Sequence, residues 1–240
     1  VAFFDGTNYN WATNSGANTN VTGLTGLTSL PAGAFTSTVN YSVTGSFSPT
    51  AALASGTLNS LKVMTSAASQ SLTLGSGSIM SLMSGGLLFA GTNDYSITGG
   101  TLKSVTATAS DLIVQQYGTG ALTISSVIAN GTAASTLTKA GPGKLVLSGV
   151  NTYTGANFLN GGSLEVSADN ALGSGGGLNF YGGTLSIVGA STFSSTRAVA
   201  LAGPGGRQHA AVRGEGELHL GRAGLAQRRP EFATEKIGDH

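Results

Sequence analysis

Residues 137–166 read LTKAGPGKLVLSGVNTYTGANFLNGGSLEV, and this stretch decides the fold class. It contains two short segments, 145–147 and 164–166, in which two apolar residues flank a middle residue, as in a half-buried strand. Between these segments lie glycine, asparagine and threonine, which favour turns. Short strands separated in this way favour a stack of β-coils over a helical domain.

The same three-residue pattern, leucine followed two positions later by an aliphatic residue, recurs along the chain. Strong copies occupy 72–74, 122–124, 145–147, 164–166 and 185–187, and weaker copies occupy 87–89 and 102–104. Pairs of glycine precede many of these copies, at 85–86, 99–100, 161–162 and 182–183. Glycine tolerates positive φ, so such pairs suit the tight corner where a coil turns from one wall to the next.

These observations predict an all-β fold, a right-handed parallel β-helix with coils of about 20 residues. One coil would bury only three or four aliphatic side chains, which does not offset the conformational entropy of ordering its backbone. Several consecutive coils are therefore required. The alternative is an antiparallel sandwich or barrel, which also has short, evenly spaced strands. The recurrence of glycine pairs at coil length favours the solenoid.

The composition agrees with a β-rich, weakly charged chain. Glycine accounts for 38 of 240 residues, and only 9% are charged, against about 25% in an average soluble domain. The absence of cysteine excludes disulfides and thiolate metal sites. The net charge of +1 gives no electrostatic support for nucleic-acid binding. No apolar run is long enough for a transmembrane helix, and the start at Val1 leads us to expect a fragment of a longer protein.

The rhythm divides the chain into three parts. Residues 1–70 are irregular and predict either atypical first coils that cap the stack or a second small domain. Residues 71–203 carry the regular pattern and predict the β-helix proper. Residues 204–240 hold six of the eleven basic residues, five of the ten acidic residues and all three histidines. The composition and the leucine pattern change at the same point, near residue 204. We therefore interpret this charged tail as disordered or out-of-frame; the alternative is a genuine C-terminal extension.

Residues 137–155 resemble the autotransporter-associated β-strand repeat, also called the passenger-associated transport repeat, at every fixed position of its first part. The second strand of the repeat follows at 162–164, and residues 171–187 resemble its usual continuation. Family members often have two threonines where this chain has Asn157 and Phe158. The residues assigned to the structural repeat are Gly141, Gly143, Leu145, Leu147, Gly149, Asn151, Tyr153, Gly155, Gly162 and Leu164.

The resemblance implies a right-handed β-helix stalk that is exported by a bacterium and displayed at the cell surface or secreted. Its expected partners are the rest of the same passenger and the membrane barrel of a longer protein. The family's repeat has no catalytic residue, so the resemblance implies no catalytic, cofactor-binding or metal-binding residue here.

An enzyme on the same fold would need two facing carboxylates if it cleaved polysaccharides. The candidates in the patterned region are Asp94, Asp111, Glu165 and Asp169. Asp94 and Asp169 adjoin asparagine and predict turns, whereas Glu165 is the middle, outward residue of a strand. Asp94 and Asp111 are spaced so that they could fall on neighbouring coils, and they are the candidate pair.

The sequence therefore favours a non-enzymatic stalk segment that supports folding, secretion and surface display of a passenger, without a cofactor. The alternative is an adhesin that binds a surface glycan or host protein through outward threonine, asparagine and tyrosine, such as Tyr117, Tyr153 and Tyr181. A polysaccharide-degrading enzyme ranks below both.

Overall fold

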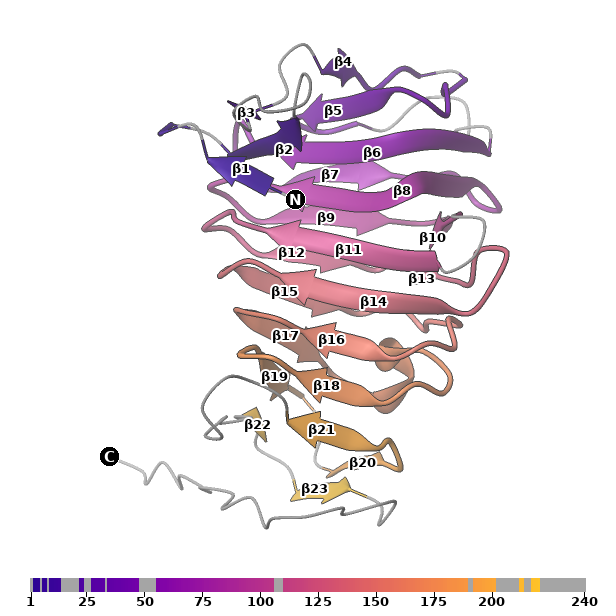
Figure 1. Ribbon diagram of the computed structural model, residues 1–240, viewed down its shortest axis with the longest axis vertical. Helices are drawn as coiled ribbons and strands as arrows, with labels where there is room; N and C mark the ends of the chain where they lie inside the picture. The colour runs from indigo at the N-terminus through magenta and orange to yellow at the C-terminus, as the bar shows by residue number, and fades with distance from the viewer. Residues whose placement is uncertain are drawn as a thin grey trace.

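The computed structural model describes residues 2–4, 6–7, 9–13, 22–23, 27–32, 34–47, 55–105, 110–189, 192–201, 212–213 and 217–220. Its strands lie one above another along a single axis, with the N-terminal coils at one end and the C-terminal coils at the other (Figure 1). Each strand pairs in parallel with the strand of the next coil, apart from one antiparallel group near the N-terminus. The predicted parallel β-solenoid is confirmed, and the antiparallel sandwich or barrel is wrong. The right-handed course of the winding stays a prediction.

One wall of the solenoid is a seven-stranded sheet. Its strands are β7 (Gln70–Thr73), β9 (Tyr95–Thr98), β12 (Leu122–Ile124), β15 (Lys144–Leu147), β17 (Ser163–Val166), β19 (Thr184–Ile187) and β22 (Val212–Arg213). All five strong leucine triplets of the sequence fall on this wall. In register, Leu122, Leu145, Leu164 and Leu185 form one continuous buried column.

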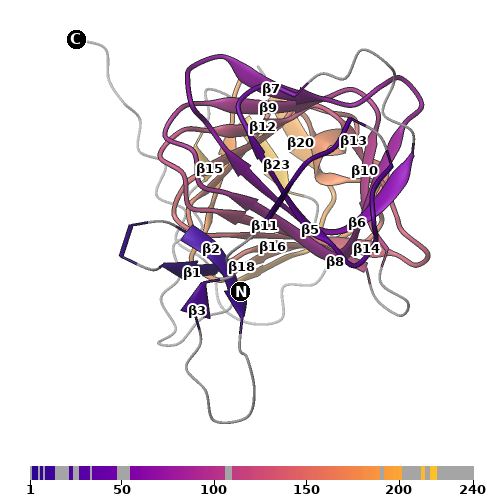
Figure 2. The same ribbon diagram turned by 90° about the horizontal axis from the view of Figure 1, so that it is seen from above.

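The opposite wall belongs to an eleven-stranded sheet. Its main path is β4 (Thr28–Ser29), β5 (Asn40–Thr44), β6 (Gly56–Met64), β8 (Ile79–Phe89), β11 (Ser110–Gln116), β14 (Ser135–Ala140), β16 (Asn157–Leu159), β18 (Leu178–Phe180) and β21 (Val199–Leu201). Two short strands, β10 (Thr101–Ser104) and β13 (Val127–Ile128), branch from β8. Seen along the axis, the two walls enclose the core, with β10 and β13 on a third side (Figure 2).

The two weaker triplets lie on the eleven-stranded sheet, not on the wall of the strong ones. Leu87 belongs to β8 and Leu102 to β10. The strand that fills the gap between β7 and β12 is β9, where Tyr95 takes the place of the leucine. Counting strands of both walls as one series shortened the apparent repeat. Apart from β4 with β5, parallel partners lie 19 to 27 residues apart, which gives about six turns of about 23 residues.

The core is a column of aliphatic and aromatic side chains between the walls. In the middle coils, residues on the inner face of the strands are buried, whereas their immediate neighbours face outward, as strand alternation requires. Buried aliphatic and aromatic side chains form one cluster that extends from coil to coil between Leu30 and Phe193. Each coil therefore buries its apolar residues against the coils on both sides.

The predicted glycine corners adopt positive φ. Each of the four pairs contains such a residue, and these residues are Gly85, Gly99, Gly100, Gly162 and Gly182. Gly85 lies within β8, between the part of the strand that pairs with β10 and the part that pairs with β11. The strand therefore continues around a corner from one side of the solenoid to the next.

The first part of the chain contains both coils and a separate small sheet. Strands β1 (Ala2–Phe4), β2 (Tyr9–Thr13) and β3 (Thr22–Gly23) pair antiparallel and lie outside the main wall (Figures 1 and 2). The ring of Tyr9 stacks on that of Tyr117, with the ring centroids 4.3 Å apart. Lys62 Nζ donates a hydrogen bond to Asn10 Oδ1 at 2.6 Å. This sheet covers the outer face of β6, β8 and β11, where Leu88 is buried although it points away from the core.

The C-terminal part of the described chain continues the stack. Strand β20 (Thr192–Ser195) pairs in parallel with β23 (Glu217–Leu220), and β22 extends the seven-stranded wall. The remainder of the charged tail predicted at 204–240 lies outside the described residues. Among the residues described, no helix is long and apolar enough to span a membrane.

Replacing Gly162 with alanine tests the corner geometry. Gly162 has a φ of 63°, and an alanine Cβ would lie 2.5 Å from Gly143 O and 2.6 Å from Gly141 O. We expect Gly162→Ala to lower the free energy of unfolding by about 2 kcal/mol or more. Urea denaturation followed by circular dichroism measures the change. Gly175→Ala is the control, because its Cβ would meet nothing closer than Thr154 O at 3.7 Å; equal losses in both variants would refute the corner account.

Candidate functional site

The residues of the repeat build the interior and the corners of two successive coils. Leu145, Leu147 and Leu164 point into the core. Gly141 and Gly162 take positive φ at corners, and Gly143 packs against the buried side chain of Gln116. Gln116 Nε2 donates to the carbonyl oxygens of Gly120 (2.7 Å) and Lys144 (2.9 Å). A side chain at position 143 would displace this amide, so the motif's glycine makes room for a bond between coils.

Asn151 replaces strand pairing on the third side of the solenoid, where the described chain between β15 and β16 forms no strand. Its Oδ1 accepts from the backbone N–H of Ile128 at 2.8 Å, in the coil before. Its Nδ2 donates to Ala171 O at 2.5 Å, in the coil after. One buried amide thus connects three coils through groups that would otherwise be buried without a partner.

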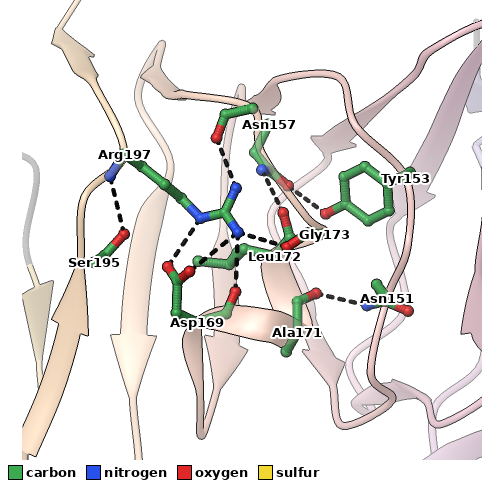
Figure 3. A network of polar contacts seen from close by, with 10 residues as sticks. Asn151, Tyr153, Asn157, Asp169, Ala171, Leu172, Gly173, Ser195 and Arg197 are labelled. Atoms are coloured by element: carbon green, nitrogen blue, oxygen red, sulfur yellow. Dashed lines mark hydrogen bonds and ion pairs between the residues drawn. The ribbon is translucent and has the colours of Figure 1, made fainter.

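Tyr153 and Asn157 form a second buried polar contact beside this one. The Tyr153 hydroxyl donates to Asn157 Oδ1 at 2.6 Å, and Asn157 Nδ2 donates to Leu172 O at 3.1 Å (Figure 3). Both side chains have no solvent exposure. Burial raises the pKa of the Tyr153 hydroxyl, which keeps it protonated and able to donate. The expectation that Tyr153 faces outward to bind a ligand is wrong, because its ring fills the core.

Asn157 was missed as an internal residue, although the sequence held a signal for it. Leu159 is an inward residue of β16, and residues two apart on a strand share a face. That alternation places Asn157 inward and Phe158 outward, against the order that hydrophobicity alone suggests. The apparent departure from the usual threonine pair is therefore a buried hydrogen-bonding position next to an outward, half-buried ring.

Arg197 fastens the next coil to the same region. Its Nε donates to Asp169 Oδ1 at 2.9 Å, Nη1 donates to Gly176 O at 2.7 Å, and Nη2 donates to Gly173 O at 2.6 Å (Figure 3). Asp169 begins the short 3-10 helix η1 (Asp169–Leu172). The planar guanidinium suits this set of acceptors because its donors point in several fixed directions. Asp169 thus serves a turn and an ion pair with a neighbouring coil.

Lys139 is a buried lysine inside the same stretch, with 1% of its surface exposed. Its Nζ donates to three backbone carbonyls, those of Ala140 (3.1 Å), Gly141 (2.8 Å) and Gly161 (3.0 Å). These acceptors belong to corners of two successive coils, so the ammonium holds the corners together. Burial lowers the pKa of Lys139 to about 8.

The remaining carboxylate candidates do not converge. Asp94 lies at the turn before β9, where its Oδ1 accepts from the backbone N–H of Ala121 at 2.8 Å. Asp111 lies on β11 in the eleven-stranded sheet and accepts from the hydroxyls of Thr136 and Thr138. Glu165 faces outward and contacts Lys144 at 3.4 Å. Each carboxylate therefore has a partner of its own, and Asp94, in a turn, and Asp111, on β11, line different surface depressions.

Two shallow depressions mark the outer surface of the described coils. One, of about 470 Å³, is lined by Asp111, Thr138, Phe158, Asn160 and Tyr181. The other lies over the turns that contain Asp94. The described residues contain no group of three or more His, Cys, Asp or Glu arranged to hold a metal ion. Of the three tyrosines considered for ligand binding, Tyr181 is exposed, whereas Tyr117 is partly covered by Tyr9.

Comparison with known proteins identifies the repeat. Residues 137–166 match the family model described as the passenger-associated-transport-repeat. Over 114 residues, or 47% of this chain, the sequence is 39% identical to the protein named adhesin BmaC autotransporter, from Brucella suis biovar 1 (strain 1330). The aligned region spans 3% of that much longer relative. No solved structure matches the chain.

Removing the hydroxyl of Tyr153 tests the buried polar contact. Tyr153→Phe keeps the ring but leaves Asn157 Oδ1 without its donor, so we expect a loss of about 1–3 kcal/mol in the free energy of unfolding. The shift of the urea midpoint measures it. Tyr181→Phe, on the exposed ring, provides the control and should change stability by less than about 0.5 kcal/mol. A Tyr153→Phe variant as stable as the parent would remove the role assigned to this contact.

The lowered pKa of Lys139 predicts that stability rises with pH. The folded protein gives up this proton at about pH 8, whereas the unfolded chain holds it to about 10.4. Between these values the unfolded state binds more protons, so the free energy of unfolding increases as the pH rises from 8 towards 10. Above about pH 10 the tyrosines of the unfolded chain ionise, and the raised pKa values of Tyr95 and Tyr153 reverse the trend.

Thermal melts at pH 7.5, 8.5 and 9.5 measure this effect, with an expected gain on the order of 1–3 kcal/mol. Lys139→Met should abolish the rise, because methionine has no proton to lose. Lys144→Met is the matched control, since its side chain is 47% exposed, and it should retain the rise. The same pH dependence in the Lys139→Met variant would assign the effect to another group.

Proposed function

Taking the passenger-associated-transport-repeat at residues 137–166 as the premise, we propose that this chain is a non-enzymatic stalk segment of an exported bacterial passenger. It supports folding and secretion of the passenger and displays other parts of it at the cell surface. Its partners are the preceding and following coils of a longer protein and the membrane anchor of that protein. The match to a short part of a much longer adhesin autotransporter supports this placement.

The observation that carries the proposal is the use of the repeat residues. Among the polar side chains inside the repeat, Asn151 and Asn157 bond to neighbouring coils, and Tyr153 donates to Asn157; none of the three faces an accessible cavity. Lys139 likewise bonds only to backbone carbonyls of consecutive corners in the described contacts. Side chains that bond to neighbouring coils are typical of a structural element, because each repeat of a solenoid is stabilised by its contacts with the repeats beside it.

A second candidate function is adhesion through the outer walls. The relative's name, an adhesin, favours this reading, as does the exposed aromatic ring of Tyr181 on an otherwise polar wall. Adhesion and a stalk role are compatible, because binding would use outward residues and the stalk uses inward ones. A polysaccharide-degrading activity has less support, because Asp94 lies in the turn before β9 and Asp111 on β11, and the two line different surface depressions.

Deleting whole and partial turns tests the stalk role. The chain would be placed between a signal peptide and the translocator of a bacterial autotransporter, with an epitope tag at its outer end. Because Tyr95 pairs with Leu122, deletion of residues 95–121 removes one full turn and keeps the following strands in register. Deletion of residues 95–108 removes about half a turn and misaligns the walls.

We expect the full-turn deletion to keep surface display of the tag, measured by antibody labelling of intact cells, within about twofold of the parent. The half-turn deletion should lose most of the display, because a misaligned coil buries polar residues and exposes leucines. Display at the parent's level by both deletions would contradict a role that depends on the stacked fold. Loss of display by both would indicate that residues 95–121 carry a specific function of their own.

A further inference from the structure

The depression over the eleven-stranded sheet is a trough that crosses four strands obliquely. Asp111 is in register with Thr136, two residues before Thr138, and Phe158 is in register with Asn179, two residues before Tyr181. Asp111 lies on β11, Thr138 on β14 and Phe158 on β16, and Tyr181 immediately follows β18. The strands pair in this order, so the lining residues come from four consecutive coils. Neighbouring strands lie about 4.8 Å apart, so three steps span about 14 Å along the solenoid axis. The offset of about four residues adds about 13 Å along the strands, so the trough is about 19 Å long.

One half of the trough is aromatic. The rings of Phe158 and Tyr181 have centroids 6.3 Å apart and are inclined by 32°. Tyr181 is 47% exposed, and both rings lie on the outer face rather than in the core. Phe158 is flanked in register by two polar outward residues, Thr138 on β14 and Asn179 on β18. Paired rings on such a wall offer apolar faces to a ligand that carries C–H groups.

The other half is polar and held in place. Asp111 Oδ1 accepts from Thr136 Oγ1 at 2.8 Å and from Thr138 Oγ1 at 3.1 Å, and Thr138 Oγ1 also lies 3.0 Å from Oδ2. These contacts fix the carboxylate on the wall and leave lone pairs for a donor from outside, because a carboxylate can accept about four hydrogen bonds. Asn160, which is exposed, adds an amide that both donates and accepts.

This chemistry selects among ligand classes. The lining contains no lysine or arginine to attract phosphate or another anion. It contains one carboxylate, which is already partly occupied by hydroxyls, and this arrangement does not favour a cation. Strands β11, β14, β16 and β18 each have partners on both sides, so an incoming peptide finds no free strand edge here. Aromatic faces beside hydrogen-bonding groups fit a neutral sugar chain.

We propose that this trough binds a neutral oligosaccharide laid obliquely across the strands, with about three to four sugar units spanning β11 to β18. The C–H faces of the sugars stack on Phe158 and Tyr181, and their hydroxyl groups donate to Asp111 and bond to Asn160. The site is separate from the buried contacts assigned to the stalk role, because every lining residue faces outward whereas Asn151, Tyr153 and Asn157 are buried.

A glycan array tests the proposal. The intact chain would be applied to immobilised tri- to hexasaccharides of glucose, galactose, mannose and N-acetylglucosamine, beside sialylated and sulfated glycans. Retained neutral glycans would then be titrated in solution by calorimetry against the parent and single variants. Tyr181→Ala and Phe158→Ala remove one ring each, Asp111→Asn keeps the shape while removing the charge, and Val150→Ala changes an exposed apolar residue outside the trough.

We expect retention of at least one neutral glycan, an affinity loss of about tenfold or more in Tyr181→Ala and Phe158→Ala, and a smaller loss in Asp111→Asn. Val150→Ala should bind as the parent does. Circular dichroism melts identify any variant with a damaged fold; should Phe158→Ala be one, Tyr181→Ala carries the test.

The proposal would be overturned if the chain retained only charged glycans or none at all. It would also be overturned if Tyr181→Ala and Phe158→Ala lost no more affinity than Val150→Ala. Surface display should be the same in Tyr181→Ala and the parent, so failure here leaves the stalk proposal standing.

Discussion

The structure depends on the parallel, in-register pairing of each coil with the next. A single turn of about 23 residues leaves both edges of its strands unpaired and its leucines half covered, so it gains stability only from its neighbours. The column from Leu122 through Leu145 and Leu164 to Leu185 shows the consequence, because identical residues meet at each step. A one-residue change in register would bring outward residues such as Glu165 into the core.

Where the chain leaves the strands, buried polar side chains take over the connection between coils. Asn151 joins the coils before and after it, Tyr153 and Asn157 bond to each other and to η1, and Arg197 bonds to the loop that contains Gly173 and Gly176. Lys139 does the same at the opposite end of β14. The repeat thus contains two kinds of residue that join coils: leucines that pack in the walls, and hydrogen-bonding side chains that connect the coils elsewhere.

The alternation of leucines and the glycine pairs were sufficient to predict the solenoid and the use of positive φ at its corners. They were not sufficient to assign strands to walls, because β8 and β10 carry leucines as regularly as the other sheet does, and a period of two cannot tell the walls apart. The roles of Lys139 and Arg197 could not be predicted either, since their acceptors are mostly backbone carbonyls that the sequence does not mark. The inward direction of the Asn157 side chain was predictable, because Asn157 lies two residues before the inward Leu159 on the same strand. The trough required the register of four strands, which places Phe158 next to Tyr181 across a coil boundary.

Oxidative cross-linking between neighbouring coils tests the in-register stack most directly, because the chain has no cysteine of its own. Thr123 and Val146 are outward partners on β12 and β15, so Thr123→Cys with Val146→Cys places two thiols about 5 Å apart. Thr123→Cys with Glu165→Cys spans two strand spacings, about 10 Å, which is too far for a disulfide. In-register parallel pairing of β12 with β15 predicts rapid disulfide formation in the first variant and little in the second. Equal rates in the two variants, or none in the first, would contradict the parallel stack.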